Sequence, residues 1–256
     1  MNETWQIWSG IFPSFASAPK AHDVHSDDIW VDKSKLSMKI LAKADLCDTE
    51  IHMFHSYPIF SAILILLERH ANIVVVDIGG NFGQLGKIIE LQAPRTAGRV
   101  HWIVVENERI VEEGKDLGLG DGITFCTKKN LLDHKYDAKV HLIHFGSVIQ
   151  YFENWQDEII FYVNLFDPEF IGFSDAVVGN VNTYISSQDY YGSHQPYRFL
   201  NQDDFETYIS RLDFNLEYRW PNIHNKTELY FPQSGFTKDR QIAHTFNYIF
   251  RKGQMK

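Results

Sequence analysis

This sequence has little cysteine and no cluster of typical metal-binding residues. Cys47 and Cys126 are its only cysteines among 256 residues, which excludes a disulfide-rich scaffold. Neither is spaced from a histidine like a zinc ligand, so we expect two small buried hydrophobic side chains. The twelve histidines are scattered, without an obvious arrangement of paired histidines and carboxylates. The sequence therefore predicts no metal site.

Long apolar runs and basic clusters are missing as well. The most apolar stretch, residues 59–67, is too short to span a bilayer, and the N-terminus does not resemble a signal peptide. The net charge is −9, and the longest basic clusters are the pairs at 128–129 and 251–252. Nucleic-acid binding needs clustered Lys and Arg. We therefore expect a cytoplasmic protein without a membrane span and without a nucleic-acid partner.

Alternating strands and helices are what the sequence does contain. Apolar runs predict strands at 74–77, 100–106, 123–126, 140–145, 170–174, 215–219 and 243–251. Helical periodicity predicts helices at 52–70, 84–92, 110–117, 154–165 and 203–212, with a partly helical segment at 26–43. This alternation is typical of an α/β protein with a mostly parallel sheet and helices on both faces. Residues 1–21 are aromatic, and we expect them to be irregular.

Residues 73–86, I-V-V-V-D-I-G-G-N-F-G-Q-L-G, are the most informative stretch. Asp77 closes a β-branched strand, and Gly79, Gly80 and Gly83 allow a sharp turn that approaches a ligand closely. The helix behind the turn directs its free N–H groups at the same place. A carboxylate at this entrance would repel the phosphates of a dinucleotide or ATP. It suits S-adenosylmethionine, which is cationic and carries no phosphate.

A second carboxylate supports this interpretation. Glu106 ends the second predicted strand, 23 residues after Gly83, where it can accept hydrogen bonds from ribose hydroxyls. Asp77 alone could cap a helix and Glu106 alone could be a solvated strand end, but together they favour a cofactor site. Asn81 stands where many such loops have glycine and tolerates a positive φ. No carboxylate follows the third strand to meet the adenine. The predicted cofactor-binding residues are Asp77, Gly79, Gly80, Asn81, Phe82, Gly83, Glu106, Ser147 and Gln150.

The acceptor side is predicted from residues 179–196, a polar and aromatic stretch too long for an ordinary connection. Methyl transfer from a sulfonium is an in-line displacement, and an alcohol acceptor also benefits from a general base. The candidate catalytic residues are His194, Asp175 and Tyr191. The candidate substrate-binding residues are Tyr151, Tyr190 and Gln188. A histidine in a surface loop would fit His194 equally well, and an anionic acceptor would need no base.

These residues resemble the class I S-adenosylmethionine-dependent methyltransferases. A narrower resemblance is to a methyltransferase family associated with bacterial surface-polysaccharide biosynthesis (capsule or O-antigen). The segments that carry it are 8–14 (W-S-G-I-F-P-S), 77–80 (D-I-G-G), 149–151 (I-Q-Y) and 191–196 (Y-G-S-H-Q-P). The resemblance implies a single Rossmann-like seven-stranded sheet, an N-terminal extension or lid over residues 1–50 and a methyltransferase domain over 51–256. It also implies S-adenosyl-L-methionine as donor and a small-molecule or glycan-precursor acceptor, a sugar hydroxyl or a phosphate- or phosphoramidate-type oxygen.

Two other functions remain open on the sequence alone. A nicotinamide-dependent oxidoreductase would use the same sheet, but Asp77 and the missing G-x-G-x-x-G pattern disfavour it. A non-catalytic binding module could instead hold a glycan-biosynthesis enzyme through its aromatic N-terminus, since a fold alone does not establish activity.

Overall fold

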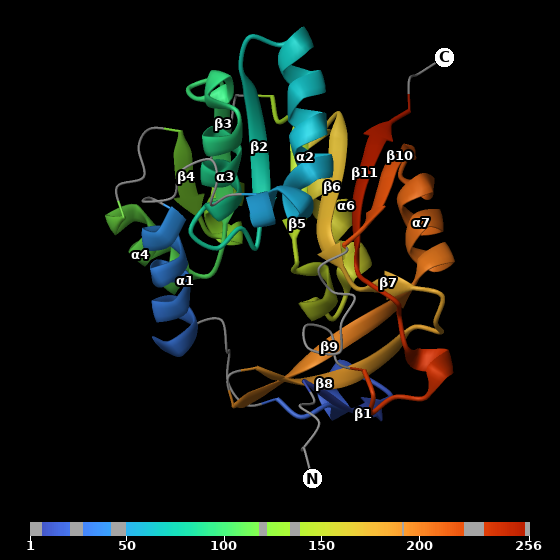
Figure 1. Ribbon diagram of the computed structural model, residues 1–256. Helices are drawn as coiled ribbons and strands as arrows, with labels where there is room; N and C mark the ends of the chain where they lie inside the picture. Colours follow the sequence, from blue (N-terminus) through green and yellow to red (C-terminus); the bar gives the residue numbers. More distant parts are fainter. Residues whose placement is uncertain are drawn as a thin grey trace.

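The computed structural model describes residues 7–20, 28–41, 50–117, 122–133, 139–190, 192–222 and 233–253 (Figure 1). The strands of these residues form a seven-stranded sheet and a smaller four-stranded sheet. The small sheet lies beyond the carboxyl ends of the central strands of the large one (Figure 1).

The large sheet has the strand order β10-β11-β6-β5-β2-β3-β4. Its members are β2 (Ile73–Ile78), β3 (Val100–Val105), β4 (Ile123–Cys126), β5 (Leu142–Gly146), β6 (Phe170–Ala176), β10 (Phe214–Pro221) and β11 (Phe246–Lys252). The first five pair in parallel, and β11 runs antiparallel between β6 and β10. The central strands read as continuous apolar runs because helices cover both faces of the sheet. The predicted mostly parallel sheet is confirmed.

Helices cover the large sheet on two sides. On one side, α2 (Glu50–Arg69) and α3 (Gln84–Gln92) share a buried cluster with alternate residues of β2 and β3. On the other, α6 (Trp155–Phe166) and α7 (Gln202–Arg211) pack on the remaining residues of the same strands. The shorter α4 (Glu108–Asp116) and α5 (Lys128–Asp133) follow β3 and β4. No helix in the described ranges is both long and apolar enough to cross a membrane.

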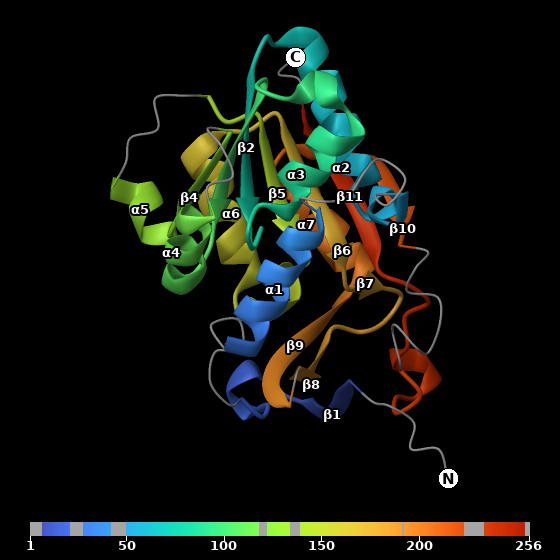
Figure 2. The same ribbon diagram turned by 60° about the vertical axis from the view of Figure 1, so that its left-hand side comes forward.

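The helix α1 (Asp28–Leu41) lies outside this alternating pattern. Its buried residues Val31 and Met38 pack against Phe82 and Ile88, which belong to the glycine turn and α3. Figure 2 shows α1 at the carboxyl edge of the large sheet, between β2 and the small sheet. Within the predicted partly helical segment at 26–43, residues 28–41 form a helix beside the turn.

The small sheet corrects two predictions. Residues 179–196, expected to be a loop, are largely the hairpin of β8 (Tyr184–Tyr190) and β9 (Ser193–Asn201). The aromatic N-terminus, expected to be irregular, contains β1 (Trp8–Phe12), which pairs with β8, and β7 (Val178–Gly179) completes the sheet. Strand formation here depends on cross-strand packing of Ser, Gln and aromatic side chains, which composition does not reveal.

Aromatic contacts join the small sheet to the large one. The Trp8 ring lies 5.4 Å from that of Tyr197 and 5.7 Å from that of Phe199. Tyr197 in turn contacts Tyr151, with 5.2 Å between ring centroids, on the short helical turn that follows β5. Segments far apart in the sequence therefore meet at the carboxyl edge. The proposed domain boundary at residue 50 stays a prediction.

Candidate functional site

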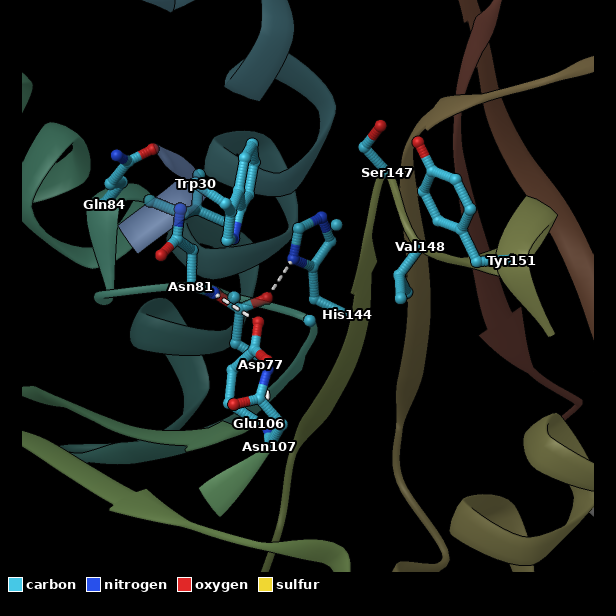
Figure 3. A pocket seen from close by; sticks show the side chains of 14 residues that line it. Trp30, Asp77, Asn81, Gln84, Glu106, Asn107, His144, Ser147, Val148 and Tyr151 are labelled. Atoms are coloured by element: carbon cyan, nitrogen blue, oxygen red, sulfur yellow. Dashed lines mark hydrogen bonds and ion pairs between the residues drawn. The ribbon is translucent and has the colours of Figure 1, made fainter. Parts of the chain in front are cut away.

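A cavity of about 380 Å³ opens at the carboxyl edge of the large sheet, beneath α1 (Figure 3). It is lined by Trp30, Asp77, Gly79, Gly80, Asn81, Gln84, Leu85, Glu106, Asn107, His144, Gly146, Ser147, Val148 and Tyr151. Seven of these were predicted as site residues: Asp77, Gly79, Gly80, Asn81, Glu106, Ser147 and Tyr151. In Figure 3, Trp30, Asn81 and Gln84 lie on one side, Ser147, Val148 and Tyr151 on the other. Residues predicted from the sequence therefore lie on both sides of the cavity.

The glycine turn has the backbone conformation that its residues suggest. Gly79 and Asn81 have φ of 68° and 52°, in the left-handed region that glycine and asparagine tolerate. A Cβ at Gly79 would lie 2.8 Å from Val148. A Cβ at Gly80 would overlap Oδ2 of Asp77. Glycine at position 80 is therefore what lets the carboxylate lie against the turn.

Asp77 is the most unusual group in the cavity. Its side chain is 1% exposed, and its Oδ1 lies 2.7 Å from Nδ1 of His144. Its Oδ2 is buried and has no hydrogen-bond partner among the described residues. A buried carboxylate oxygen without a donor is costly in free energy. Because Asp77 lines the cavity, a hydrogen-bond donor on a ligand could supply the missing partner.

Glu106 is held in place by the backbone. Its two oxygens accept hydrogen bonds from the N–H groups of Asn81 (3.0 Å) and Asn107 (3.1 Å). Asn107 caps α4 by accepting from the N–H of Ile110 at 3.1 Å. Each carboxylate oxygen has two lone pairs, so Glu106 can also accept from a ligand hydroxyl.

Three of the predicted cofactor residues shape the turns and do not line the cavity. Phe82 is fully buried and packs against α1, and Gly83, with φ of 72°, begins α3. Gln150 is buried and donates its Nε2–H to the carbonyl oxygen of Ser147 at 2.7 Å. Ser147 itself has φ of 51° and lines the cavity. The direct role of Phe82, Gly83 and Gln150 in binding stays a prediction.

The predicted substrate-binding residues Tyr151 and Gln188 do meet. The Tyr151 hydroxyl donates to Oε1 of Gln188 at 2.9 Å, and Gln195 donates to the same oxygen at 3.2 Å. These amides belong to the small sheet, whereas Tyr151 lines the cavity. The Tyr190 side chain and the whole of Tyr191 lie outside the described parts of the structure.

His194 lies on the other face of the hairpin. It pairs with Asp189 across the two strands, whereas its neighbour Gln195 pairs with Gln188. Successive side chains of a strand point to opposite faces. Gln188 and Gln195 share the face that contacts Tyr151, so His194 faces away from it and is exposed. The structure does not bring His194 into the cavity, and its role as a base stays a prediction.

Asp175 is occupied by contacts that join three segments. Its Oδ1 accepts from Asn222 at 2.9 Å and from Thr245, and its Oδ2 accepts from Ser147 at 3.3 Å. Its backbone N–H donates to Asn247 at 2.9 Å. Asp175 does not line the cavity. The geometry assigns it a structural task, and a role as base or substrate ligand stays a prediction.

Sequence reasoning missed several lining residues, of which Trp30 and His144 are the most informative. Trp30 comes from α1, and no sequence pattern connects that helix with the glycine turn. His144 did leave a signal, because it is a polar residue near the end of the apolar strand β5. Its position opposite Asp77 depends on the register of β2 and β5.

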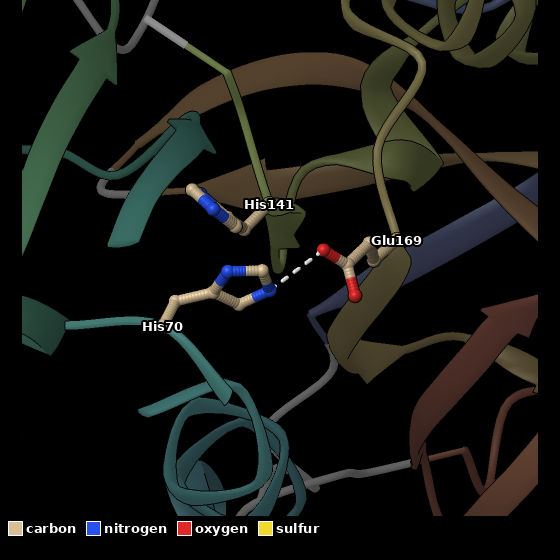
Figure 4. Close-up of side chains that lie close together, drawn as sticks. All are labelled: His70, His141 and Glu169. Atoms are coloured by element: carbon tan, nitrogen blue, oxygen red, sulfur yellow. Dashed lines mark hydrogen bonds and ion pairs between the residues drawn. The ribbon is translucent and has the colours of Figure 1, made fainter. Parts of the chain in front are cut away.

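A second group of titratable side chains lies at the amino ends of the same strands (Figure 4). His70, His141 and Glu169 place their ligand-type atoms within 4.8 Å of one another, although the sequence predicted no metal site. His70 Nε2 is 2.9 Å from Glu169, which also pairs with Lys139 (2.9 Å) and Arg69 (3.1 Å). This carboxylate already has three cationic or proton-donating partners.

His141 makes this group unsuitable for a metal. Its Nδ1 accepts the backbone N–H of Val74 at 3.1 Å, so the neutral ring carries its proton on Nε2. Ligation through Nε2 would require the loss of that proton or of the Val74 hydrogen bond.

Burial, with the neighbouring charges of His70 and Lys139, lowers the pKa of His141. Burial raises the pKa of Glu169, but the Lys139 hydrogen bond and surrounding cations outweigh it and lower the pKa overall.

Neither the family models nor the curated protein sequences with which the chain was compared match it. Solved structures do share its fold. An S-adenosylmethionine-dependent methyltransferase from Clostridium acetobutylicum has a TM-score of 0.52 and 10% identity, over 87% of this chain and 99% of that one. A chain of the complex between the Haloferax volcanii Trm112 methyltransferase activator and a methyltransferase has a TM-score of 0.51 and 11% identity. That match covers 90% of this chain and 96% of the other.

The chain therefore has the Rossmann-like fold of class I methyltransferases, as predicted. Its cavity lies at the carboxyl ends of the parallel strands, the usual place for ligands in open α/β sheets. At such low identity, the likeness establishes the fold alone.

Proposed function

We propose that this protein is an S-adenosylmethionine-dependent methyltransferase that binds its donor in the cavity around Asp77. The observation that carries this proposal is Oδ2 of Asp77, a buried carboxylate oxygen without a partner in the described structure. An ammonium group such as that of the methionine half would give this oxygen a charge-assisted hydrogen bond. The methyltransferase neighbours support the same function through the fold.

The charge of the cavity supports a cationic ligand. Its lining contains the carboxylates of Asp77 and Glu106 and, within the described ranges, no Lys or Arg. Two carboxylates raise the affinity for a sulfonium and an ammonium and oppose the phosphates of NAD or ATP. This distribution favours a methyl donor over a nicotinamide cofactor.

Different residues would bind different parts of the donor. Glu106, anchored by two backbone N–H groups, would accept the ribose hydroxyls. Asp77 would hold the ammonium group, and Ser147 would lie near the methionine half. Gln150 would act through its hydrogen bond to the Ser147 carbonyl. When bound, S-adenosylmethionine would supply a methyl group on a sulfonium, and these residues would align it for in-line displacement.

The helix α1 would cover the donor. Trp30 lines the cavity, and Oγ of Ser34 accepts a hydrogen bond from the Asn81 side chain at 2.8 Å. These contacts fasten α1 to the glycine turn. They support the predicted lid function for part of residues 1–50, because a covered site excludes water from the reacting groups.

For the acceptor, we propose an uncharged, hydroxyl-bearing and carbohydrate-linked group. Tyr151 and the amides of Gln188 and Gln195 form the cavity's connection to the small sheet, and these groups suit hydroxyl recognition. A phosphate-type acceptor would need cations that the described lining lacks. Three segments of the surface-polysaccharide resemblance meet here: β1, the turn at Ile149–Tyr151 and β9. Because that resemblance is to a surface-polysaccharide family, we propose a role in bacterial surface-polysaccharide biosynthesis.

Calorimetric titration with S-adenosylhomocysteine tests the donor site directly. We expect saturable binding by the full chain and no binding of NADH under the same conditions. A folded protein that gives no heat with S-adenosylhomocysteine at about millimolar concentration, a free energy near −4 kcal/mol, contradicts the proposal. Transfer of a labelled methyl group to extracted surface glycans then tests the acceptor. Donor binding and co-purification with a partner, without transfer to any glycan, would favour the binding module.

A further inference from the structure

We propose that His144 is a positioning residue of the donor site: supported by Ser174, it holds one oxygen of Asp77 and leaves the other for the ligand. The role in donor binding rests on the proposed function. The arrangement of the three side chains does not, and can be tested without a ligand.

The three side chains form one hydrogen-bonded chain. Nδ1 of His144 lies 2.7 Å from Oδ1 of Asp77, and Nε2 lies 2.8 Å from Oγ of Ser174. The side chains of His144 and Asp77 are 3% and 1% exposed. Both ring nitrogens therefore have partners, while Oδ2 of Asp77 has none among the described residues.

Strand register brings the three residues together. Asp77 of β2 lies opposite His144 of β5, which lies opposite Gly172 of β6. Ser174 is two residues further along β6 and therefore points to the same face as Gly172. A Cβ at Gly146 would lie 3.1 Å from Cε1 of the imidazole. The ring therefore lies close to Gly146, where any larger residue would crowd it.

For a neutral ring, the hydrogen-bond partners specify the tautomer. An ionised Asp77 can only accept, so Nδ1 of His144 carries a proton. In the neutral ring Nε2 then accepts from the Ser174 hydroxyl. This tautomer satisfies Oδ1 of Asp77 without adding a second full charge, and it preserves the negative charge for a cationic ligand.

The same order of Asp, His and Ser activates a serine nucleophile in hydrolases. Here Ser174 is not among the described residues that line the cavity, whereas His144 and Asp77 are. Ser174 would therefore stabilise the orientation of the His144 ring. The hydrogen bonds among the three side chains would position Asp77 rather than activate Ser174.

Three variants separate positioning from mere packing. His144→Leu keeps bulk but removes the donor, whereas His144→Asn keeps an N–H near the position of Nδ1. We expect His144→Leu to weaken S-adenosylhomocysteine binding about tenfold or more, the scale of one charge-assisted hydrogen bond. His144→Asn should restore affinity to within about threefold of the native protein, and Ser174→Ala should lose only about threefold. His101→Asn, a change on β3 outside the cavity lining, is the matched control.

Circular dichroism would establish that each variant folds. A folded His144→Leu variant with native affinity would overturn the proposal, and so would a His144→Asn variant that loses as much as His144→Leu.

The ligand-free readout is the tautomer of His144, measured by nitrogen NMR on histidine-labelled protein. The signal missing from His144→Asn identifies the residue. We expect its proton on Nδ1 in the native protein and a changed tautomer in Asp77→Ala. A native His144 with its proton on Nε2 alone would overturn the proposal. A native protein that shows the expected tautomer but binds no S-adenosylhomocysteine would overturn the proposed function and leave the positioning of Asp77 standing.

Discussion

At each end of the central strands a histidine lies beside a carboxylate, but among the described residues only one of the two carboxylates has a hydrogen-bond partner on both oxygens. At the amino end, Glu169 is surrounded by His70, Lys139 and Arg69. At the carboxyl end, Asp77 has His144 on one oxygen and, within the described residues, nothing on the other. The first group has its charge compensated by protein alone, which is typical of a structural cluster. The second group retains a buried carboxylate oxygen without a hydrogen-bond partner among the described residues, which is typical of a ligand site.

The largest expected effect comes from removing the two carboxylates in turn. Asp77→Ala should weaken S-adenosylhomocysteine binding at least tenfold, about 1.4 kcal/mol, because the ligand loses a charge-assisted hydrogen bond. Glu169→Ala should leave that affinity within about twofold, because Glu169 is at the opposite edge of the sheet. Calorimetry on both variants checks the pair. Equal losses of affinity in the two variants would show that the carboxyl edge is not the donor site.

A smaller loss of affinity is expected from Gly80→Ala. The new Cβ would overlap Oδ2 of Asp77 and push the carboxylate away from the turn. We expect binding to weaken about fivefold, or roughly 1 kcal/mol, with the fold retained. Gly122→Ala is the control, because a Cβ there makes only an ordinary contact at 3.7 Å. Native affinity in Gly80→Ala would show that Asp77 does not need its present position.

The amino-edge group is expected to affect stability. Glu169→Gln keeps the size of the side chain but removes the charge that Lys139 and Arg69 share. We expect the free energy of unfolding in urea to fall by about 1 kcal/mol, less at high salt, because the side chain is partly exposed. An unchanged unfolding midpoint at low salt would show that these ion pairs contribute nothing.

The smallest expected effect is on the pH dependence of stability. Burial and nearby cations lower the pKa of His141 below its ordinary 6.5, so unfolding takes up a proton as the pH falls through that value. Stability is therefore highest above the ordinary pKa and declines below it. His141→Asn should reduce the decline between about pH 7.5 and pH 5.5, measured by urea unfolding.

Part of the decline should persist in that variant, because burial also lowers the pKa of His101. A variant with the native pH slope would show that His141 titrates normally in the folded protein.

The carboxyl-edge site was partly predictable because its elements are local in sequence. The strand, Asp77 and the glycine turn are contiguous, and Glu106 follows at the end of the next strand. Periodicity and turn chemistry therefore identified them. His144 was missed because its contact with Asp77 depends on strand register, which a single sequence does not specify.

The acceptor side was harder to predict for a related reason. The many polar and aromatic residues of the stretch 179–196 suggest a loop, yet residues 184–190 and 193–201 form a hairpin, one face of which contacts Tyr151. The hairpin register decided that Gln188 and Gln195 share this face and that His194 does not. A shift of one residue would have reversed the assignment.

By itself, the sequence determined the mostly parallel α/β sheet, the glycine turn and the carboxylates at two strand ends, because these follow from apolar periodicity and local backbone chemistry. Only the tertiary structure decided which histidine reaches Asp77, which face of the hairpin contacts Tyr151 and which cations pair with Glu169. Those contacts join residues tens of positions apart, so they exist only after the strands have paired and the helices have packed.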